Sequence, residues 1–251
     1  MRSFEDLVAE GNAVPTEGWN VSWFEGRATE QRPSWGYQRL IGERLAGVES
    51  ALDLQTGGGE VLAGVPVAPP RLVATESWAP NLEIARHNLA KHGASVVSVL
   101  DWEDLPFDSS SFELVISRHP TVTIWPEIAR VLEPGGSYLS QQVGAGSVRE
   151  LTDFVMGPQP VGVERDPQAV ASQAEAVGLE VVELRPESLR LEFFDIAAVV
   201  HFLRKVIWIV PGFTVEAYGE RLRALHEQIE ADGSFVATTE RFLIEARKPA
   251  G

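Results

Sequence analysis

The sequence predicts an α/β protein built on a mostly parallel β-sheet with helices on both faces. Between residues 49 and 185, short apolar runs typical of buried strands alternate with helical segments. The first apolar run ends in three consecutive glycines, as a strand that feeds a ligand-binding turn does. A final run, at residues 235–246, alternates apolar and polar residues and reads as one more strand.

Strands and helices follow one another in a regular order through this region. Helices are expected where apolar residues recur every three to four positions, and Pro66, Gly93 and Gly178 end three of them. The seven expected strands are residues 49–54, 72–75, 96–100, 112–116, 137–143, 179–184 and 235–246, and the helices between them are residues 60–65, 77–93, 124–132 and 166–177.

Helical segments also flank this core. Helices are expected at residues 1–12 and 37–48, before the first strand. Two more, at residues 194–210 and 215–231, stand between the last two strands, with Pro211 and Gly212 separating them. The predicted organisation is therefore an N-terminal arm or lid and a core that is interrupted by a helical insertion. The boundaries are 1–48 for the arm, 49–185 for the core, 186–233 for the insertion and 234–251 for the last strand.

Composition limits the function classes. A chain of 251 residues with 44% hydrophobic residues buries a sizeable core. Without cysteine, disulfides and thiolate metal sites are excluded, and we expect no metal. A net charge of −15 weighs against a nucleic-acid partner. The most apolar segment, residues 196–210, is too short and too charged to span a membrane, and no secretory leader is evident, so we expect a cytoplasmic protein, monomeric or homodimeric.

The glycine-rich loop after the first strand is the first candidate binding site. From Asp53 it reads D-x-Q-x-G-G-G, which does not match the G-x-G-x-x-G spacing of dinucleotide-binding loops. Glycines let a ligand approach the backbone, and a helix beginning near Glu60 would direct its first N–H groups at the same place. An ordinary glycine-rich turn explains the loop alone about equally well.

Acidic residues follow the next two strands. Glu76 ends the second strand about 20 residues after Gln55, where a carboxylate can accept hydrogen bonds from ribose hydroxyls. Asp101 and Trp102 directly follow the third strand. The alternatives are an exposed charge for Glu76 and core packing for Trp102.

Three stretches together resemble class I S-adenosylmethionine-dependent methyltransferases. They are the loop D-L-Q-T-G-G-G, the segment D-W-E-D-L-P-F-D-S-S-S-F-E-L-V from residue 101, and the turn E-I-A-R-V-L-E-P-G-G-S-Y-L from residue 127. They occur in the order and spacing of that family and cover about residues 50–143. One departure is Gln55, which stands where the family loop has its first glycine.

The resemblance implies a Rossmann-like sheet of seven strands with an antiparallel last strand. It also implies the cofactor S-adenosyl-L-methionine, which leaves as S-adenosyl-L-homocysteine. The residues expected to bind it are Asp53, Gln55, Thr56, Gly57, Gly59, Glu76, Ser77, Asp101, Trp102 and Arg118.

The methyl acceptor has to be held by the less regular parts of the chain. Aromatic residues crowd residues 19–37, so this segment is expected to form a lid or pocket wall, or else to pack as an arm. The expected pocket residues are Trp23, Trp35, Tyr37 and Phe202. His119, after the fourth strand, and His201 are the candidate bases, although each could instead be a structural histidine.

The predicted function is methyl transfer to a small organic acceptor. Two alternatives stay open at this stage. A methyltransferase acting on RNA or protein would need a basic face, and the sequence shows no obvious one. A non-catalytic relative that only binds the cofactor is also possible, because of Gln55 and the lack of an obvious single base.

Overall fold

The computed structural model describes residues 2–18 and 21–251, which form two compact units. The core unit comprises residues 33–145, 163–187 and 241–251. The helical unit comprises the chain up to residue 32 together with residues 146–162 and 188–240. Trp19, the first aromatic residue of the predicted lid, lies outside the described residues. Two long strands, β7 (Glu180–Phe193) and β8 (Phe235–Arg247), contribute residues to both units.

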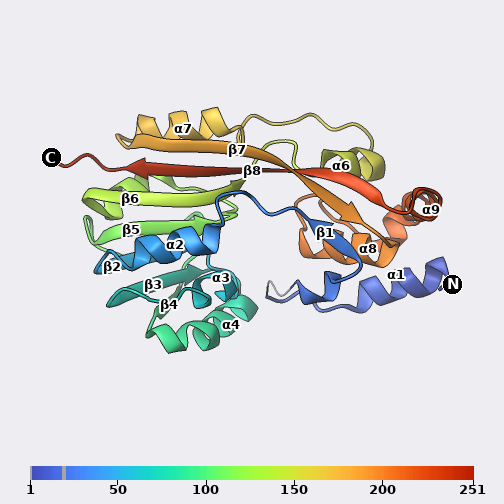
Figure 1. The fold of residues 1–251 in the computed structure, drawn as a ribbon, viewed down its shortest axis with the longest axis horizontal. Helices are drawn as coiled ribbons and strands as arrows, with labels where there is room; N and C mark the ends of the chain where they lie inside the picture. Colours follow the sequence, from blue (N-terminus) through green and yellow to red (C-terminus); the bar gives the residue numbers. More distant parts are fainter. Residues whose placement is uncertain (1, 19–20) are drawn as a thin grey trace. The chain divides into compact units, whose positions relative to one another are not determined.

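The core unit is organised around parallel strands in the order expected for a nucleotide-binding α/β sheet (Figure 1). The central strand β2 (Ser50–Leu54) lies between β3 (Arg71–Glu76) and β5 (Phe112–Arg118) and is parallel to both. Next to β3 lies β4 (Ser95–Ser98), and next to β5 lies β6 (Leu132–Val143), again parallel. Strand β8 pairs antiparallel with β6, so the predicted mostly parallel sheet with an antiparallel last strand is confirmed.

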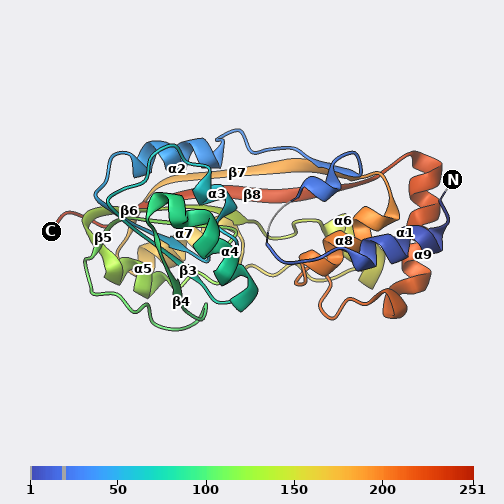
Figure 2. The ribbon, with the colours of Figure 1, turned by 90° about the horizontal axis from the view of Figure 1, so that it is seen from below.

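Helices cover both faces of this sheet (Figures 1 and 2). Side chains alternate along each strand: Leu52 packs with α5 (Trp125–Val131) and α7 (Pro167–Ala176) on one face. Its neighbour Ala51 packs with helices on the opposite face, namely α2 (Tyr37–Leu45), α3 (Glu60–Ala63) and α4 (Ala79–Leu89). The sheet is therefore buried on both sides, and the ends of its strands are what remains available for a ligand.

The helical unit has its own hydrophobic core. Its helices are α1 (Phe4–Ala13), α6 (Arg149–Met156), α8 (Ile196–Lys205) and α9 (Val215–Asp232). Helix α1 packs closely on α8, because a Cβ added at Gly11 would lie 2.4 Å from the carbonyl oxygen of Ala197. A capping box between Ser3 and Asp6 begins α1, and the Asp195 side chain caps α8. Within the part of the chain that the structure describes, no helix is long and apolar enough to cross a membrane.

Several elements differ from the prediction, among them helix α6, which the sequence did not predict, and strand β6, which begins at Leu132 and not at residue 137. Strand β7 continues to Phe193, because Leu189, Leu191 and Phe193 alternate inward from the polar residues between them. A short strand β1 (Ala28–Glu30) pairs antiparallel with this extension, so the sheet of the described residues has eight strands where the sequence predicted seven. Helix α8 ends at Lys205 and does not run to residue 210. Its last-turn cations point back to the carbonyl oxygens of residues 11, 14, 16 and 18.

Candidate active site

The glycine loop follows β2, every residue of which is buried. Gly57 and Gly59 have positive φ angles of 63° and 74°, which glycine adopts at little cost. At Gly59 a Cβ would lie 3.0 Å from Leu89 Cγ, so the loop also packs closely against α4. Gln55 has a φ of 55° as well, and for this residue the left-handed conformation costs about 1–2 kcal/mol. The family's first glycine is thus replaced by a residue that keeps the glycine-like backbone.

The Gln55 side chain offsets that cost by joining three parts of the site. Its Oε1 accepts a 2.6 Å hydrogen bond from the backbone N–H of Thr121, and the Thr121 hydroxyl oxygen lies 3.0 Å away. Its Nε2 donates to the carbonyl oxygen of Val122 at 2.6 Å. The Thr121 hydroxyl also lies 2.6 Å from Asp101 Oδ2 and donates to it. The ends of β2 and β5 and the loop after β4 are therefore connected through two side chains.

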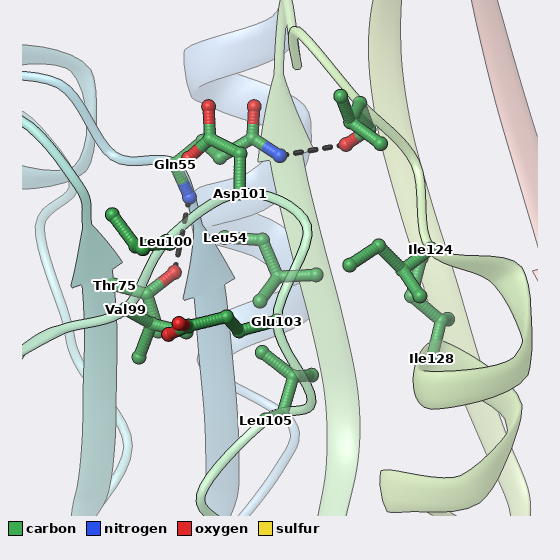
Figure 3. Close-up of a pocket in the computed structure, with 11 residues that line it drawn as sticks. Leu54, Gln55, Thr75, Val99, Leu100, Asp101, Glu103, Leu105, Ile124 and Ile128 are labelled. Atoms are coloured by element: carbon green, nitrogen blue, oxygen red, sulfur yellow. Dashed lines mark hydrogen bonds between the residues drawn. The ribbon is translucent and has the colours of Figure 1, made fainter.

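A small pocket of about 30 Å³ lies beneath this connection. Figure 3 shows Gln55 and Asp101 together at one end of the pocket, with Leu54, Ile124 and Ile128 along its wall. Most of the side chains that line the pocket are apolar, and the Asp101 carboxylate stands at its end.

Glu76 is buried at the end of β3. Its Oε1 accepts hydrogen bonds from the backbone N–H groups of Ser77 and Trp78, at 2.9 and 2.8 Å. Burial raises the pKa of Glu76 above its ordinary value, and the N–H donors oppose that rise. Ser77, half-buried, thus supports the carboxylate through its backbone.

Asp53 is buried one residue before the end of β2. Burial, with a smaller contribution from the nearby Glu76 carboxylate, raises the pKa of Asp53 to about 7. Thr56 is fixed by a 2.9 Å hydrogen bond from its backbone N–H to the carbonyl oxygen of Thr75. Acidic side chains thus end or follow each of the neighbouring strands β2, β3 and β4, which crowds like charges at one edge of the sheet.

The remaining predicted cofactor residues occupy open positions. Trp102 follows Asp101 and is 71% exposed, so it does not pack in the core. Arg118 is the last residue of β5 and is exposed.

His119 lies next to Arg118 and takes a left-handed φ of 54°. Its Nε2 is 2.8 Å from Gln141 Nε2, and Gln141 Oε1 accepts a 2.8 Å hydrogen bond from the indole N–H of Trp35. The buried Tyr37 donates to the carbonyl oxygen of Ser117 at 2.7 Å. The structure therefore brings three predicted residues, Trp35, Tyr37 and His119, to the carboxyl end of β5. Removal from water and nearby arginines hold the pKa of His119 well below its ordinary value.

The other predicted acceptor residues belong to the helical unit. His201 is 1% exposed and lies between Trp23 and Phe24, with both ring centroids 5.0 Å from its own. Burial and the nearby cations Lys205 and Arg204 lower the pKa of His201 to about 4. Phe202 contacts Phe193 edge-on. The predicted acceptor pocket thus names residues of both units, Trp23 and Phe202 of one and Trp35 and Tyr37 of the other, and it stays a prediction.

Several residues of this region were not singled out from the sequence. Thr121 and Gln141 connect predicted residues to one another, and Arg165 and Arg241 lower the pKa of His119. The position of Thr121 just after the fourth strand was the one available signal, whereas the positions of Gln141 and Arg241 depend on strand register. Within the described residues, no group of acidic, histidine or cysteine side chains could hold a metal ion.

The donor and acceptor chemistry of this site fits an adenosyl cofactor. Ribose hydroxyls and the adenine amino group are hydrogen-bond donors, and Glu76 and Asp101 offer carboxylate acceptors at the ends of adjacent strands. The loop after β2 contains two glycines with positive φ angles, Gly57 and Gly59.

Comparison with known proteins agrees with this fit. Residues 52–140 match the family model described as a methyltransferase domain. No curated protein matches the chain by sequence.

Solved structures share the fold. A protein of Bacillus halodurans C-125 assigned as a methyltransferase aligns with a TM-score of 0.62 and 19% identity, over 86% of this chain and 99% of that one. A protein of Galdieria sulphuraria assigned as a sarcosine dimethylglycine methyltransferase aligns with a TM-score of 0.53 and 16% identity, over 98% of each chain.

A further solved structure contains the cofactor. Phosphoethanolamine N-methyltransferase 2 of Haemonchus contortus, in complex with S-adenosyl-L-methionine, aligns with a TM-score of 0.50 and 18% identity, over 86% of this chain and 53% of that one. The matched residues 52–140 contain the glycine loop, Glu76, Asp101 and the end of β5. Residues 52–140 therefore form a methyltransferase domain, and the chain shares the fold of these solved structures.

Proposed function

We propose that this enzyme methylates a small organic acceptor. The observation that carries the proposal is the placement of the glycine loop, Glu76 and Asp101 beside a polar end of β5 that contains His119. With a net charge of −15, the chain is poorly suited to attract a nucleic-acid backbone. Two of the similar structures are of proteins named for small acceptors, sarcosine and dimethylglycine in one case and phosphoethanolamine in the other.

The cofactor would be held along the ends of β2, β3 and β4. Gly57 and Gly59 give backbone access, Glu76 is placed for the ribose hydroxyls, and Asp101 with Trp102 is placed for the adenine. Asp53, Gln55, Thr56 and Ser77 shape the loop around these groups, and Arg118 stands at its β5 side.

S-adenosyl-L-methionine, when bound, supplies a methyl group that its sulfonium makes electrophilic. The protein's main contribution is then to align the acceptor atom with that methyl group and to exclude water. Trp35 and Tyr37 fix the backbone and side chains at the end of β5, where the acceptor is expected. Where the acceptor atom carries a proton, His119 is the first candidate to receive it and His201 the second, and His119 can do so only once its Nε2 releases the Gln141 amide 2.8 Å away. We expect a cytoplasmic enzyme that acts as a monomer or homodimer.

Two measurements test this proposal. Isothermal titration with S-adenosyl-L-homocysteine and with NAD should give saturable binding for the first ligand only. Formation of S-adenosyl-L-homocysteine should then be followed with pools of small amines, alcohols and acids, and separately with total RNA and with a protein extract. Turnover confined to RNA or protein would contradict the small acceptor, and cofactor binding without turnover in any pool would favour a protein that only binds the cofactor.

A further inference from the structure

Basic side chains gather where β5, β6 and β8 lie side by side. Arg118 on β5 is paired with Gln141 on β6, and Arg241 on β8 is paired with Val143, two residues further along β6. Paired residues on neighbouring strands present their side chains on the same face, and so do residues two positions apart. Arg118, Gln141 and Arg241 therefore belong to one face of the sheet.

Arg165 joins this group from the segment before α7. Its carbonyl oxygen accepts a 3.1 Å hydrogen bond from the N–H of Ala145, just beyond the end of β6. Its guanidinium lies 3.5 Å from the carbonyl oxygen of Thr121, just beyond the end of β5. Arg165, Arg118 and Arg241 all act electrostatically on His119, and among the described residues no carboxylate counts among the charges that do so.

Arg165 lacks a counter-ion. The described part of the chain gives it no ion pair, although it is half-buried and burial lowers its pKa. Taking a guanidinium out of water without an anionic partner costs free energy, so a buried cation is normally paired. In a chain with a net charge of −15, carboxylates for such a pair are plentiful elsewhere. Their absence from this position indicates that the anion comes from a ligand.

The hydrogen bonds of His119 determine which of its ring nitrogens carries a proton. The indole N–H of Trp35 can only donate, so the oxygen of the Gln141 amide faces Trp35. The NH₂ group of Gln141 then faces His119, and His119 Nε2 has to be the acceptor. A neutral His119 therefore carries its proton on Nδ1, for which the described residues provide no hydrogen-bond partner. His119 thus offers an N–H donor beside three guanidinium groups.

We propose that Arg165 and Arg241, with His119 Nδ1–H as a further donor, bind an anionic group of the methyl acceptor, a carboxylate or a phosphate, beside Arg118. The inference rests on the proposed small acceptor and narrows its chemistry. Planar guanidinium groups match both anions geometrically, and a neutral N–H donor adds a hydrogen bond without a further charge. The acceptor binds at the β5–β6–β8 half of the sheet, whereas the adenosyl group of the cofactor binds at the β2–β3–β4 half.

The proposal can be tested without knowing the acceptor. Protein labelled with ¹⁵N in arginine and histidine is saturated with S-adenosyl-L-homocysteine and titrated with sodium acetate and with sodium phosphate. Choline chloride at equal ionic strength is the control. We expect the NMR chemical shifts of the Arg165 and Arg241 Nε–H groups to change saturably with at least one of the two anions. The ring ¹⁵N signals of His119 should be those of the tautomer protonated on Nδ1. Shifts that equal those in choline chloride, or an Nε2–H pattern for His119, would overturn the proposal.

Substitutions separate this site from the cofactor site. Arg165→Gln and Arg241→Gln should weaken the binding of the responding anion at least tenfold and change the Kd of S-adenosyl-L-homocysteine less than twofold. Arg86→Gln, an exposed arginine of α4 paired with Glu83, is the matched control and should change neither. Loss of S-adenosyl-L-homocysteine binding in Arg165→Gln or Arg241→Gln, with an unchanged melting temperature, would assign the arginines to the cofactor and overturn the proposal. If the parent protein does not bind S-adenosyl-L-homocysteine at all, the proposed function fails as well.

Discussion

The two halves of the core-unit sheet carry opposite charges at their ligand-binding ends. Asp53, Glu76 and Asp101 stand at or just after β2, β3 and β4, and burial raises the pKa of the first two. Arginines stand instead around β5, β6 and β8, where they lower the pKa of His119. Hydrogen-bond acceptors on one side and donors on the other are what a cofactor rich in hydroxyl and amino groups and an anionic acceptor would require. The strands of both halves belong to one sheet, but the side chains at their ends differ in charge between the two halves.

The largest expected effect concerns the crowded carboxylates. Since the pKa of Asp53 is about 7 in the folded protein and 3.8 for an ordinary aspartate in water, protonation of Asp53 favours folding. The associated stability is present below about pH 4 and is lost as the pH rises through about 7. A difference of one in pKa corresponds to about 1.4 kcal/mol, so protonation of Asp53 contributes about 4 kcal/mol at most to the free energy of unfolding.

Asp53→Asn should therefore be more stable relative to the parent protein at pH 8 than at pH 5. Denaturant unfolding without cofactor at the two pH values measures the difference. Asp104→Asn, an exposed acidic residue of the same unit, is the control and should show no such dependence. An identical stability difference at both pH values would mean that Asp53 is already ionised at pH 5.

The next largest effect is expected at Glu76, whose carboxylate at the end of β3 is proposed to accept hydrogen bonds from the ribose hydroxyls. Glu76→Gln keeps the shape of the side chain, but its amide presents a donor to a ribose hydroxyl and weakens the charge-assisted bonds. Each such bond contributes about 1.5–3 kcal/mol, so the Kd for S-adenosyl-L-homocysteine should rise by about tenfold or more. Isothermal titration measures it, with Glu83→Gln on the exposed face of α4 as the control. An unchanged Kd would remove Glu76 from the ribose site.

The acidic half of the sheet could be predicted from the sequence because its signals are local. A buried apolar run, a run of glycines and an acidic residue at a strand end are all read within ten residues, and Gln55, Glu76 and Asp101 fall where those runs end. The methyltransferase domain and its mostly parallel sheet were predicted from the same local patterns.

The basic half could not be predicted in this way. Arg241 approaches His119 only because β8 is antiparallel to β6 in a particular register, and Gln141 is oriented by Trp35, 106 residues away in the chain. The extension of β7 had a local signal, the alternation of Leu189, Leu191 and Phe193, but its partner strand β1 has three residues and no pattern of its own. Contacts between distant segments depend on register, which local periodicity does not determine.

A smaller effect is expected at Asp101. Asp101 is half-buried whereas Glu76 is buried, so less binding free energy is lost with the carboxylate of Asp101 than with that of Glu76. Asp101→Ala should raise the Kd for S-adenosyl-L-homocysteine about tenfold, which is about 1.4 kcal/mol. S-inosylhomocysteine has an oxygen in place of the adenine amino group. Its Kd should therefore rise much less than that of S-adenosyl-L-homocysteine when Asp101 is replaced by alanine. Equal losses for the two ligands would show that Asp101 does not recognise the amino group.

The smallest effect on stability, and the sharpest test of the boundary between the two halves, concerns Gln55. Gln55→Gly removes the cost of about 1–2 kcal/mol that a residue with a Cβ atom incurs in the left-handed conformation. It also removes side-chain hydrogen bonds to Thr121 and Val122 that contribute about 1 kcal/mol each. The two changes oppose each other, so the free energy of unfolding should change by no more than about 1 kcal/mol. The backbone N–H of Thr121, however, loses its acceptor, and its hydrogen exchange should become faster.

Gln55→Asn separates the two contributions, because asparagine tolerates the left-handed conformation but is one methylene shorter. If the hydrogen bonds hold the loop after β5, Thr121 exchange should accelerate in both variants, whereas Gln38→Ala, which removes a side-chain bond between α2 and α3, should leave it unchanged. Slow exchange of Thr121 in Gln55→Gly would mean that the loop after β5 holds its position without Gln55. The cofactor half and the acceptor half of the sheet would then be independent, and the glutamine at the first-glycine position would matter only for the backbone of its own loop.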